Sequence, residues 1–425
     1  MGRFTGILGI LFILGIAWLW SNNRRAINYR VVITGLLLQI GLAIFILKVP
    51  LGQDIFHWLG KAIQKLLDFS QEGGLFVFGD LTKVTDILPE GVVQSGIFLF
   101  ILLPTIIFVC VLVAMAYHIG LMQRVVAVIA RFVHWAMRVS GSEALSNVAS
   151  AFVGQVEAQI MIRPYLSGMT RSELLASMTG SMACIAGGVM AVYVSMGVPA
   201  SYLLAASLMA APGALVISKM VYPETEESET KGVVKLEVKK EHSNLMDAIA
   251  HGASDGMRVS INVVAMLIGV IALVALVDAL LGYFGLFLNW IGVSLTAIGL
   301  DVEHLRLKDV VGSLFSLIAI VMGVPAKESM TVGSLMGTKM VINEFVAYTD
   351  LSPMIQQGML SAKSVVIASF ALCGFANFSS VAIQIGGIGA LAPDRKADLA
   401  RLGLKAMLCG TMASYISASL AGILL

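Results

Sequence analysis

The sequence predicts an all-α membrane protein in which eight transmembrane helices accompany two oppositely oriented re-entrant hairpins. Hydrophobic residues make up 58% of the 425-residue chain and charged residues only 13%, a composition too apolar for a water-soluble domain. Apolar runs of about 20 residues, the length that crosses a bilayer, recur along the chain. Glu157 and Glu344 each stand between such runs, where a carboxylate is costly and is a functional candidate by default.

The apolar runs define the predicted spans and their orientation. Arg24, Arg25 and Arg30 follow the first run without a small-residue cleavage site, which favours a retained span over a signal peptide. Basic residues also follow the third and fifth runs, so these loops are expected in the cytoplasm and both termini outside. We expect a multi-pass protein of the plasma membrane. The predicted spans cover residues 4–20, 31–49, 96–117, 171–197, 200–221, 258–284, 361–390 and 402–425.

Two apolar segments are interrupted in the middle and are therefore predicted to be the re-entrant hairpins. Residues 141–168 are broken at 153–155, and residues 303–348 are broken at 322–325. Each hairpin precedes a span with a break of its own, at 184–188 and 373–377. The predicted orientation places the first hairpin on the cytoplasmic side and the second on the outer side. Secondary transporters build midplane sites from such inverted repeats.

One charged linker divides the chain between these two halves. Residues 223–243 carry glutamates followed by lysines and are predicted to be a cytoplasmic connector. Residues 244–255 then place apolar and polar residues at helical spacing, which predicts a separate helix lying on the membrane surface.

Polar residues at the first hairpin favour recognition of a flat heterocycle. Gln155 offers an amide and Glu157 a carboxylate, which together read an edge with both donors and acceptors. Phe375, beside Asn377 in the second break, suits stacking on a base, although most phenylalanines of a helical bundle only pack in its core. Glu157 has the alternative of a structural ion pair with Arg163.

A second set of polar residues is rich in acceptors and suits the vicinal hydroxyls of a sugar. It consists of Glu344, Asn377 and Ser380. The alternatives are structural: Glu344 would cap a helix or pair with Lys339 or Lys327. Asn377 and Ser380, three residues apart, would bond within one helix. With the first set, these residues describe a site for a neutral polyol that carries a flat base.

Other functional classes have less support. The chain lacks the GxSxG and HExxH motifs of membrane hydrolases, which disfavours an enzyme. A channel needs a continuous polar stripe, whereas these polar residues cluster at hairpins and breaks. The net charge of +2 gives no indication of nucleic-acid binding, and the four cysteines lack zinc-ligand spacing, so no cofactor is expected.

Several strings resemble a known family, the concentrative nucleoside transporters, over the chain from about residue 21 onward. NEFVAY and CGFANFSS are the most specific. The strings are GQVEA at 154–158, IRPYL at 162–166, MTRSEL at 169–174, APGALVISK at 211–219, PETE at 223–226, NEFVAY at 343–348 and ALCGFANFSS at 371–380.

The resemblance implies a homotrimeric elevator transporter that imports nucleosides such as uridine by symport. It assigns the base to Gln155 and Glu157 in a pocket with Val156, Val189 and Phe375, and the ribose to Glu344, Asn377 and Ser380. It implies scaffold and interfacial helices at 1–140, transport-domain halves at 141–222 and 303–425, a linker with interfacial helix at 223–257, and a scaffold helix with connector at 258–302.

The chain departs from the family pattern at residues that bear on coupling and specificity. Relatives commonly carry a hydroxyl residue at the position of Val156 and proline at that of Gln159. Sodium-coupled relatives carry asparagine at the position of Ser150 and serine or threonine at that of Cys184, where a thiol is a poor ligand for a hard ion. Val153 and Ile185 would supply only carbonyls to this vestigial sodium site. We therefore expect proton coupling, with sodium as the alternative.

A glycine in the first hairpin bears on which nucleosides enter. Some pyrimidine-selective relatives carry a bulkier residue at the position of Gly154. Less crowding at this position favours admitting purine nucleosides as well.

Overall fold

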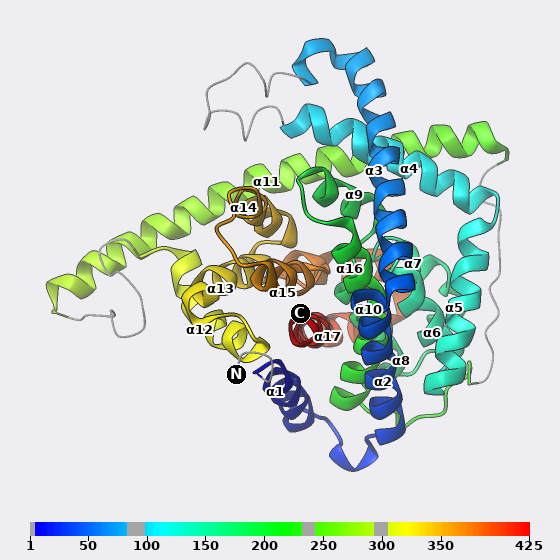
Figure 1. The fold of residues 1–425 in the computed structure, drawn as a ribbon. Helices are drawn as coiled ribbons and strands as arrows, with labels where there is room; N and C mark the ends of the chain where they lie inside the picture. The colour runs from blue at the N-terminus through cyan, green and yellow to red at the C-terminus, as the bar shows by residue number, and fades with distance from the viewer. Residues whose placement is uncertain (1–4, 83–97, 232–242, 293–304) are drawn as a thin grey trace.

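The protein is described by a computed structural model that places residues 5–82, 98–231, 243–292 and 305–425 (Figure 1). Helices and their connecting loops make up these ranges, with no strand among them, which confirms the all-α prediction. Parts of five predicted elements lie outside the described residues: residue 4 of the first span, residues 96–97 of the third, residues 232–242 of the charged linker, most of the connector after the sixth span, and residues 303–304 of the second hairpin.

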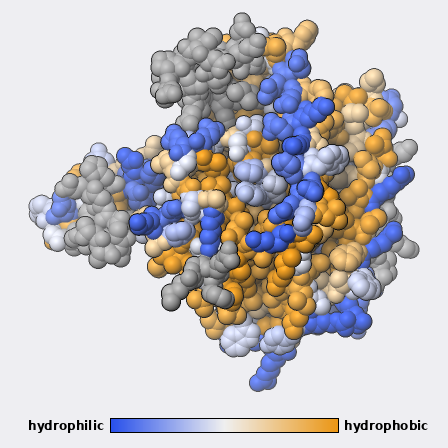
Figure 2. Space-filling view, in the orientation of Figure 1, coloured by the Kyte–Doolittle hydropathy of each residue, from blue (hydrophilic) through white to orange (hydrophobic). Residues whose placement is uncertain are grey.

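Long helices form the first part of the chain. A 29-residue helix, α3, begins with Pro50 in its first turn, where the missing N–H costs nothing. Figure 2 shows a hydrophilic strip along α3 beside a broad hydrophobic area, as expected for a helix with one polar face. The helices are α1 (Thr5–Leu19), α2 (Tyr29–Leu47), α3 (Pro50–Phe78), α4 (Phe98–His118) and α5 (Leu121–Met137).

The first predicted hairpin and the broken span after it are both present as helical elements. Capping boxes begin α6 at Ser140 with Glu143 and α8 at Thr170 with Glu173, so two backbone N–H groups at each helix start are satisfied. The predicted span 171–197 consists of two helices separated at residues 184–186. The elements are α6 (Gly141–Ser150), α7 (Glu157–Ile160), α8 (Arg171–Ala183), α9 (Gly187–Ser195) and α10 (Ala200–Val221).

The predicted surface helix 244–255 is not separate from the next span. Both belong to α11 (Leu245–Trp290), a single helix of 46 residues that runs across the view in Figure 1. Gly252 and Gly256 do not break it. A methyl group at either position would press on the backbone of α4, so these glycines allow close helix packing.

The second hairpin differs from its prediction. Residues 305–348, the described part of this segment, contain two turns, because α12 ends at Gly323 with φ +107° and α13 ends before a second turn at residues 342–343. Asn343 caps the helix that follows by accepting a hydrogen bond from the Val346 N–H at 2.9 Å, so Glu344 begins a new helix. The elements are α12 (Leu307–Met322), α13 (Ala326–Val341), α14 (Glu344–Gln356), α15 (Ala362–Leu372), α16 (Phe378–Leu391) and α17 (Lys396–Leu424).

The order of elements repeats once along the chain. Helices α4 to α10 comprise two helices, a short hairpin, a broken helix and a long helix, and α11 to α17 follow the same order when α13 and α14 are the hairpin. Corresponding helices pack on each other: α4 on α11, and α10 on the largely buried α17. The two halves therefore share one core.

Fewer helices meet the length and hydropathy of a membrane span than the eight predicted. In the described ranges five do so, or six if the pair α4 and α5, bent by 74°, forms one broken span. The shortfall has a simple cause, because α1 has 15 residues and the broken span 361–390 consists of helices of 11 and 14 residues.

A buried lysine ties the start of the first hairpin to α10. Lys219 forms ion pairs with Glu143 of α6 and with Glu224, the latter at 3.1 Å, and donates to the Ser172 hydroxyl at 2.9 Å. The side chains of Lys219 and Glu143 are only 8% and 2% exposed. Removing one member of a buried pair leaves the other charge uncompensated.

We expect Lys219→Met to destabilise the protein by about 3–5 kcal/mol, the usual cost of breaking a buried ion pair. The measurement is the thermal unfolding midpoint in detergent. Lys231→Met, at an exposed position of the adjoining loop, is the matched control and should leave the midpoint unchanged. Equal midpoints for the two variants would contradict a structural role for Lys219.

Candidate functional site

The breaks in the two broken helices touch each other inside the protein. The first begins at Cys184, directly after α8, and the second begins at Cys373, directly after α15. Gly374 has φ +116°, and a Cβ at this residue would collide with the backbone of Ala183. Only glycine fits both the conformation and the close approach.

Serines of the two long helices satisfy backbone groups that the breaks leave open. Ser207 of α10 accepts from the Ile185 N–H at 3.3 Å and donates to the Ala151 carbonyl at 3.4 Å. Ser414 of α17 donates to the Cys373 carbonyl at 2.9 Å. The breaks are thereby tolerated in a dry interior.

Glu344 lies buried at the start of α14. It contacts one residue from each broken helix, Tyr193 of α9 and Asn377 at the start of α16. Its Oε1 accepts from the Tyr193 hydroxyl of α9 at 3.1 Å, and its Oε2 accepts from Asn377 Nδ2 at 2.9 Å. Glu344 and Asn377 are 5% and 2% exposed. The structure thus brings two of the three predicted sugar-recognition residues into direct contact.

Two structural alternatives were open for the predicted sugar residues: an ion pair of Glu344 with a lysine, and a hydrogen bond between Asn377 and Ser380 within one helix. Lys339 is buried, but it donates to the Ala371 carbonyl at 2.9 Å. Asn377 caps α16 by accepting from the Ser380 backbone N–H at 2.8 Å, which confirms a bond within the helix. The Asn377 amide therefore has two roles, because its Nδ2 donates to Glu344 while its Oδ1 caps the helix.

The first hairpin reaches the same region through Gln155. Its Nε2 donates to the Ser380 hydroxyl at 3.5 Å, and its Oε1 accepts from Gln384 of α16 at 3.4 Å. Val156 does not point the same way: its methyl groups approach Gly387, where α16 has no side chain to obstruct them. Gln155 thus joins the predicted base residues to the predicted sugar residues.

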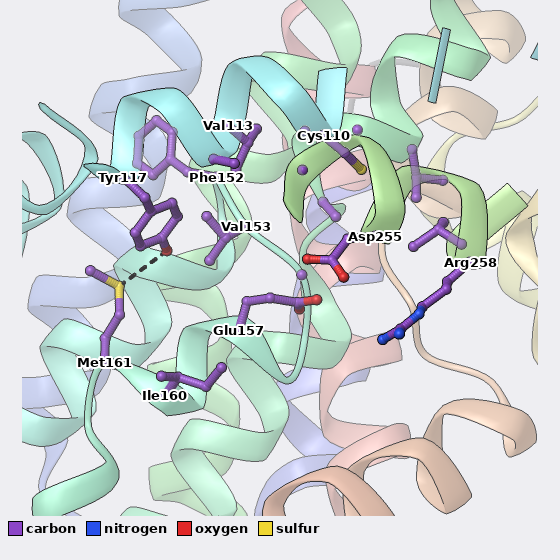
Figure 3. Close-up of a pocket in the computed structure, with 18 of the residues that line it drawn as sticks. Cys110, Val113, Tyr117, Phe152, Val153, Glu157, Ile160, Met161, Asp255 and Arg258 are labelled. Carbon is purple, nitrogen blue, oxygen red and sulfur yellow. Dashed lines mark hydrogen bonds between the residues drawn. The ribbon is translucent and has the colours of Figure 1, made fainter. Parts of the chain in front are cut away.

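Glu157 faces a cavity of about 980 Å³ between the first hairpin, α4, α9 and α11 (Figure 3). A methyl group at Gly154 would collide with the Glu157 carboxylate, so glycine leaves room for this side chain. Tyr117 of α4 closes one edge by donating to the Met161 sulfur at 3.6 Å. Other lining residues include Cys110, Val153, Val189, Asp255, Arg258 and Asn262.

Two predicted base-site residues differ in their relation to this cavity. Val189 lines it, whereas Phe375 lies half-buried against the core in the second break and is outside the lining. Arg163 also lines the cavity, but among the described residues no ion pair joins it to Glu157. The Glu157 carboxylate is therefore free to meet a ligand.

The four residues of the predicted vestigial cation site lie near the first break, and the two polar side chains among them bond to protein groups. Ser150 donates to the Ser146 carbonyl at 2.7 Å and lies 3.0 Å from the Ser181 hydroxyl. The Cys184 thiol donates to the Ser207 carbonyl at 3.5 Å. Val153 and Ile185 are buried and contribute backbone groups only.

Gln159 fills the space beside this site. It is fully buried, and its amide donates to Ser181 at 2.7 Å and accepts from Ser177 at 2.5 Å. A network of side chains thus runs from Gln159 through Ser181 to Ser150.

Several residues near the candidate site could not be identified from the sequence alone. Tyr193 and Gln384 lie in apolar helices and are recognisable only when their partners are known. Asp255 was predicted at the end of a surface helix and Arg258 at the start of the next span, whereas the continuous α11 carries both into the cavity wall. Their spacing of three residues on one helix was the available clue.

Comparisons with known proteins agree with this architecture. A family model described as "Na+ dependent nucleoside transporter C-terminus" matches residues 202–422, and the corresponding N-terminal model matches residues 8–81. A third model, "Gate: Nucleoside recognition", matches residues 99–200.

Individual proteins match over nearly their whole length. The "Uncharacterized transporter YutK" of Bacillus subtilis is 42% identical over 100% of both chains. "Nucleoside permease NupC" of Helicobacter pylori is 38% identical over 98% of this chain and 96% of its own. A solved structure of CNTnw "in an inward-facing substrate-bound state" is 39% identical, with a TM-score of 0.90 over 100% of this chain and 98% of that one.

These matches confirm the resemblance noted from the sequence motifs. The chain is a multi-pass protein of the plasma membrane and a transporter, not an enzyme. By its family models and its relatives, it belongs to the concentrative nucleoside transporter family.

Proposed function

We propose that this protein imports nucleosides across the plasma membrane as a secondary active symporter. The observation that carries the proposal is the buried contact of Glu344 with Asn377 and Tyr193, to which Gln155 is linked through Ser380. Acceptor-rich side chains at two touching helix breaks suit a polar, uncharged ligand taken out of water. Uridine is the expected type of substrate.

The proposed roles follow the chemistry of each side chain. Glu344, Asn377 and Ser380 bind the ribose, because carboxylate and hydroxyl oxygens accept from its hydroxyls. Gln155 and Glu157 read the edge of the base, while Val189 lines its face and Phe375 approaches from the second break. Val156 acts indirectly by packing the hairpin against α16.

The proposed architecture is an elevator with eight spans and two re-entrant hairpins in an inverted repeat, assembled as a homotrimer. Residues 141–222 and 303–425 form the transport domain, and residues 1–140 and 223–302 form the scaffold and linker. Two amendments follow from the helix bounds: α13 and α14 are the second hairpin, and the boundary at 257 falls within the continuous α11.

The coupling ion is proposed from two opposing considerations. The "Na+ dependent" description of the matching family model favours sodium. Against it, the oxygen of Ser150 and the thiol of Cys184 bond to protein groups, and Gln159 fills the neighbouring space. We propose proton coupling for this chain, with sodium as the competing assignment.

In proteoliposomes, we expect an inward pH gradient alone to concentrate uridine and a sodium gradient alone to fail, because the cation-site side chains are already engaged. Accumulation of labelled uridine above its external concentration is the measurement, and an ionophore that collapses the gradient is the control. Uptake driven only by sodium would reverse the assignment of the ion. Equilibration without accumulation under either gradient would indicate a channel.

Glu344→Gln should lower kcat/KM for uridine at least about tenfold, the usual loss when a hydrogen bond to a charged group is removed. An amide has only one acceptor oxygen, so either Tyr193 or Asn377 loses its partner. Glu226→Gln, at an exposed loop position, is the control and should match the wild-type protein. Equal activity of the two variants would exclude Glu344 from the site.

Tyr193→Phe should raise KM for uridine by roughly tenfold with a smaller change in kcat, since it removes one donor to Glu344 but keeps the ring. Tyr202→Phe is the matched control, because the Tyr202 hydroxyl makes no hydrogen bond within the described residues. The effect should be lost in a Glu344→Gln background. Independent effects of the two substitutions would contradict a shared role.

A further inference from the structure

The wall of the cavity opposite Glu157 carries a pair of opposite charges. Asp255 and Arg258 stand three residues apart on α11, so they share one face of the helix. Figure 3 shows the Asp255 carboxylate directed toward that of Glu157 and the Arg258 side chain extending beside them. Glu157, Asp255 and Arg258 line the same cavity, together with Cys110 of α4.

These charged groups have no partners of their own. Within the described residues, neither Asp255, Arg258 nor Glu157 makes an ion pair or a hydrogen bond, whereas the buried Lys219 makes several. Cys110, Val113 and Ala114 give the same cavity an apolar wall. All three residues are exposed, so their charged groups are in contact with solvent and accessible to a ligand that enters the cavity.

The cavity lies at the base end of the proposed site. It is lined by Glu157 and Val189, but by none of the residues proposed to bind ribose. A nucleoside with its ribose at Glu344 would therefore direct its base toward α11. A purine extends further from the ribose than a pyrimidine and would approach this wall more closely.

The hydrogen-bonding groups of Asp255 and Arg258 would distinguish one purine base from another. A carboxylate only accepts hydrogen bonds and a guanidinium only donates them. Guanine offers N1–H and N2–H₂ donors on one edge and O6 and N7 acceptors on another, and arginine binds O6 and N7 with two parallel bonds. Uracil has neither an amino group nor N7.

We propose that Asp255 and Arg258 form a guanine-selective extension of the binding site, with Asp255 accepting from N1–H and N2–H₂ and Arg258 donating to O6 and N7. This inference rests on the proposed nucleoside transport. In this proposal the base is recognised by Asp255 and Arg258 of α11 in addition to the residues of the first hairpin.

The test measures inhibition of labelled uridine uptake by guanosine, 1-methylguanosine and 7-deazaguanosine in proteoliposomes. Asp255→Asn and Arg258→Gln should each raise the guanosine inhibition constant about tenfold, as expected for one hydrogen bond to a charged group, and leave KM for uridine within about threefold. Asp68→Asn, an exposed position on α3 outside the cavity, is the matched control.

Each analogue lacks one of the two groups that one side chain would read. Asp255→Asn should raise the inhibition constant of 1-methylguanosine less than that of guanosine, because only the N2 donors remain, and Arg258→Gln should raise that of 7-deazaguanosine less, because only O6 remains. Equal shifts for uridine and guanosine, or no shift for either, would overturn the guanine assignment. A wild-type protein that takes up no uridine would instead overturn the proposed function.

Discussion

The contact between two interrupted helices is the constraint on which the remaining structure depends. Breaking a helix inside an apolar protein exposes backbone N–H and C=O groups, and each unsatisfied group is costly where water is excluded. The chain meets this cost with Ser207 and Ser414 from its two long central helices and with Gly374 at the closest approach. Polar side chains can then gather around the breaks.

The buried carboxylate of Glu344 shows how this arrangement prepares a ligand site. Tyr193 comes from the broken helix of the first half, and Asn377 comes from that of the second. The carboxylate is held by donors from both halves while its remaining lone pairs stay available. A relative shift of the two halves would therefore alter its position.

Much of this organisation could be predicted from the sequence, because glycine, proline, cysteine and asparagine interrupt otherwise continuous apolar runs. Both helix breaks and the Glu344, Asn377 and Ser380 grouping were anticipated on that basis. The turn at 342–343 was not, since Asn343 acts through a capping hydrogen bond that apolar periodicity does not reveal.

Contacts between residues that are far apart in the chain could not be predicted from the sequence. The continuity of α11 was missed because its polar start and apolar remainder look like two different environments. Close packing of Gly252 and Gly256 on α4 joins them in one helix. Tyr193 could not be singled out, since its partner Glu344 lies 151 residues away in the chain.

The uninterrupted length of α11 has a mechanical consequence. At 1.5 Å per residue its 46 residues extend about 69 Å, more than twice the ~30 Å hydrocarbon thickness, so the rod must lean or emerge at its ends. In the elevator proposed above, a stiff helix of this length belongs to the scaffold, and the proposed transport domain would move past the same row of α11 side chains throughout its travel.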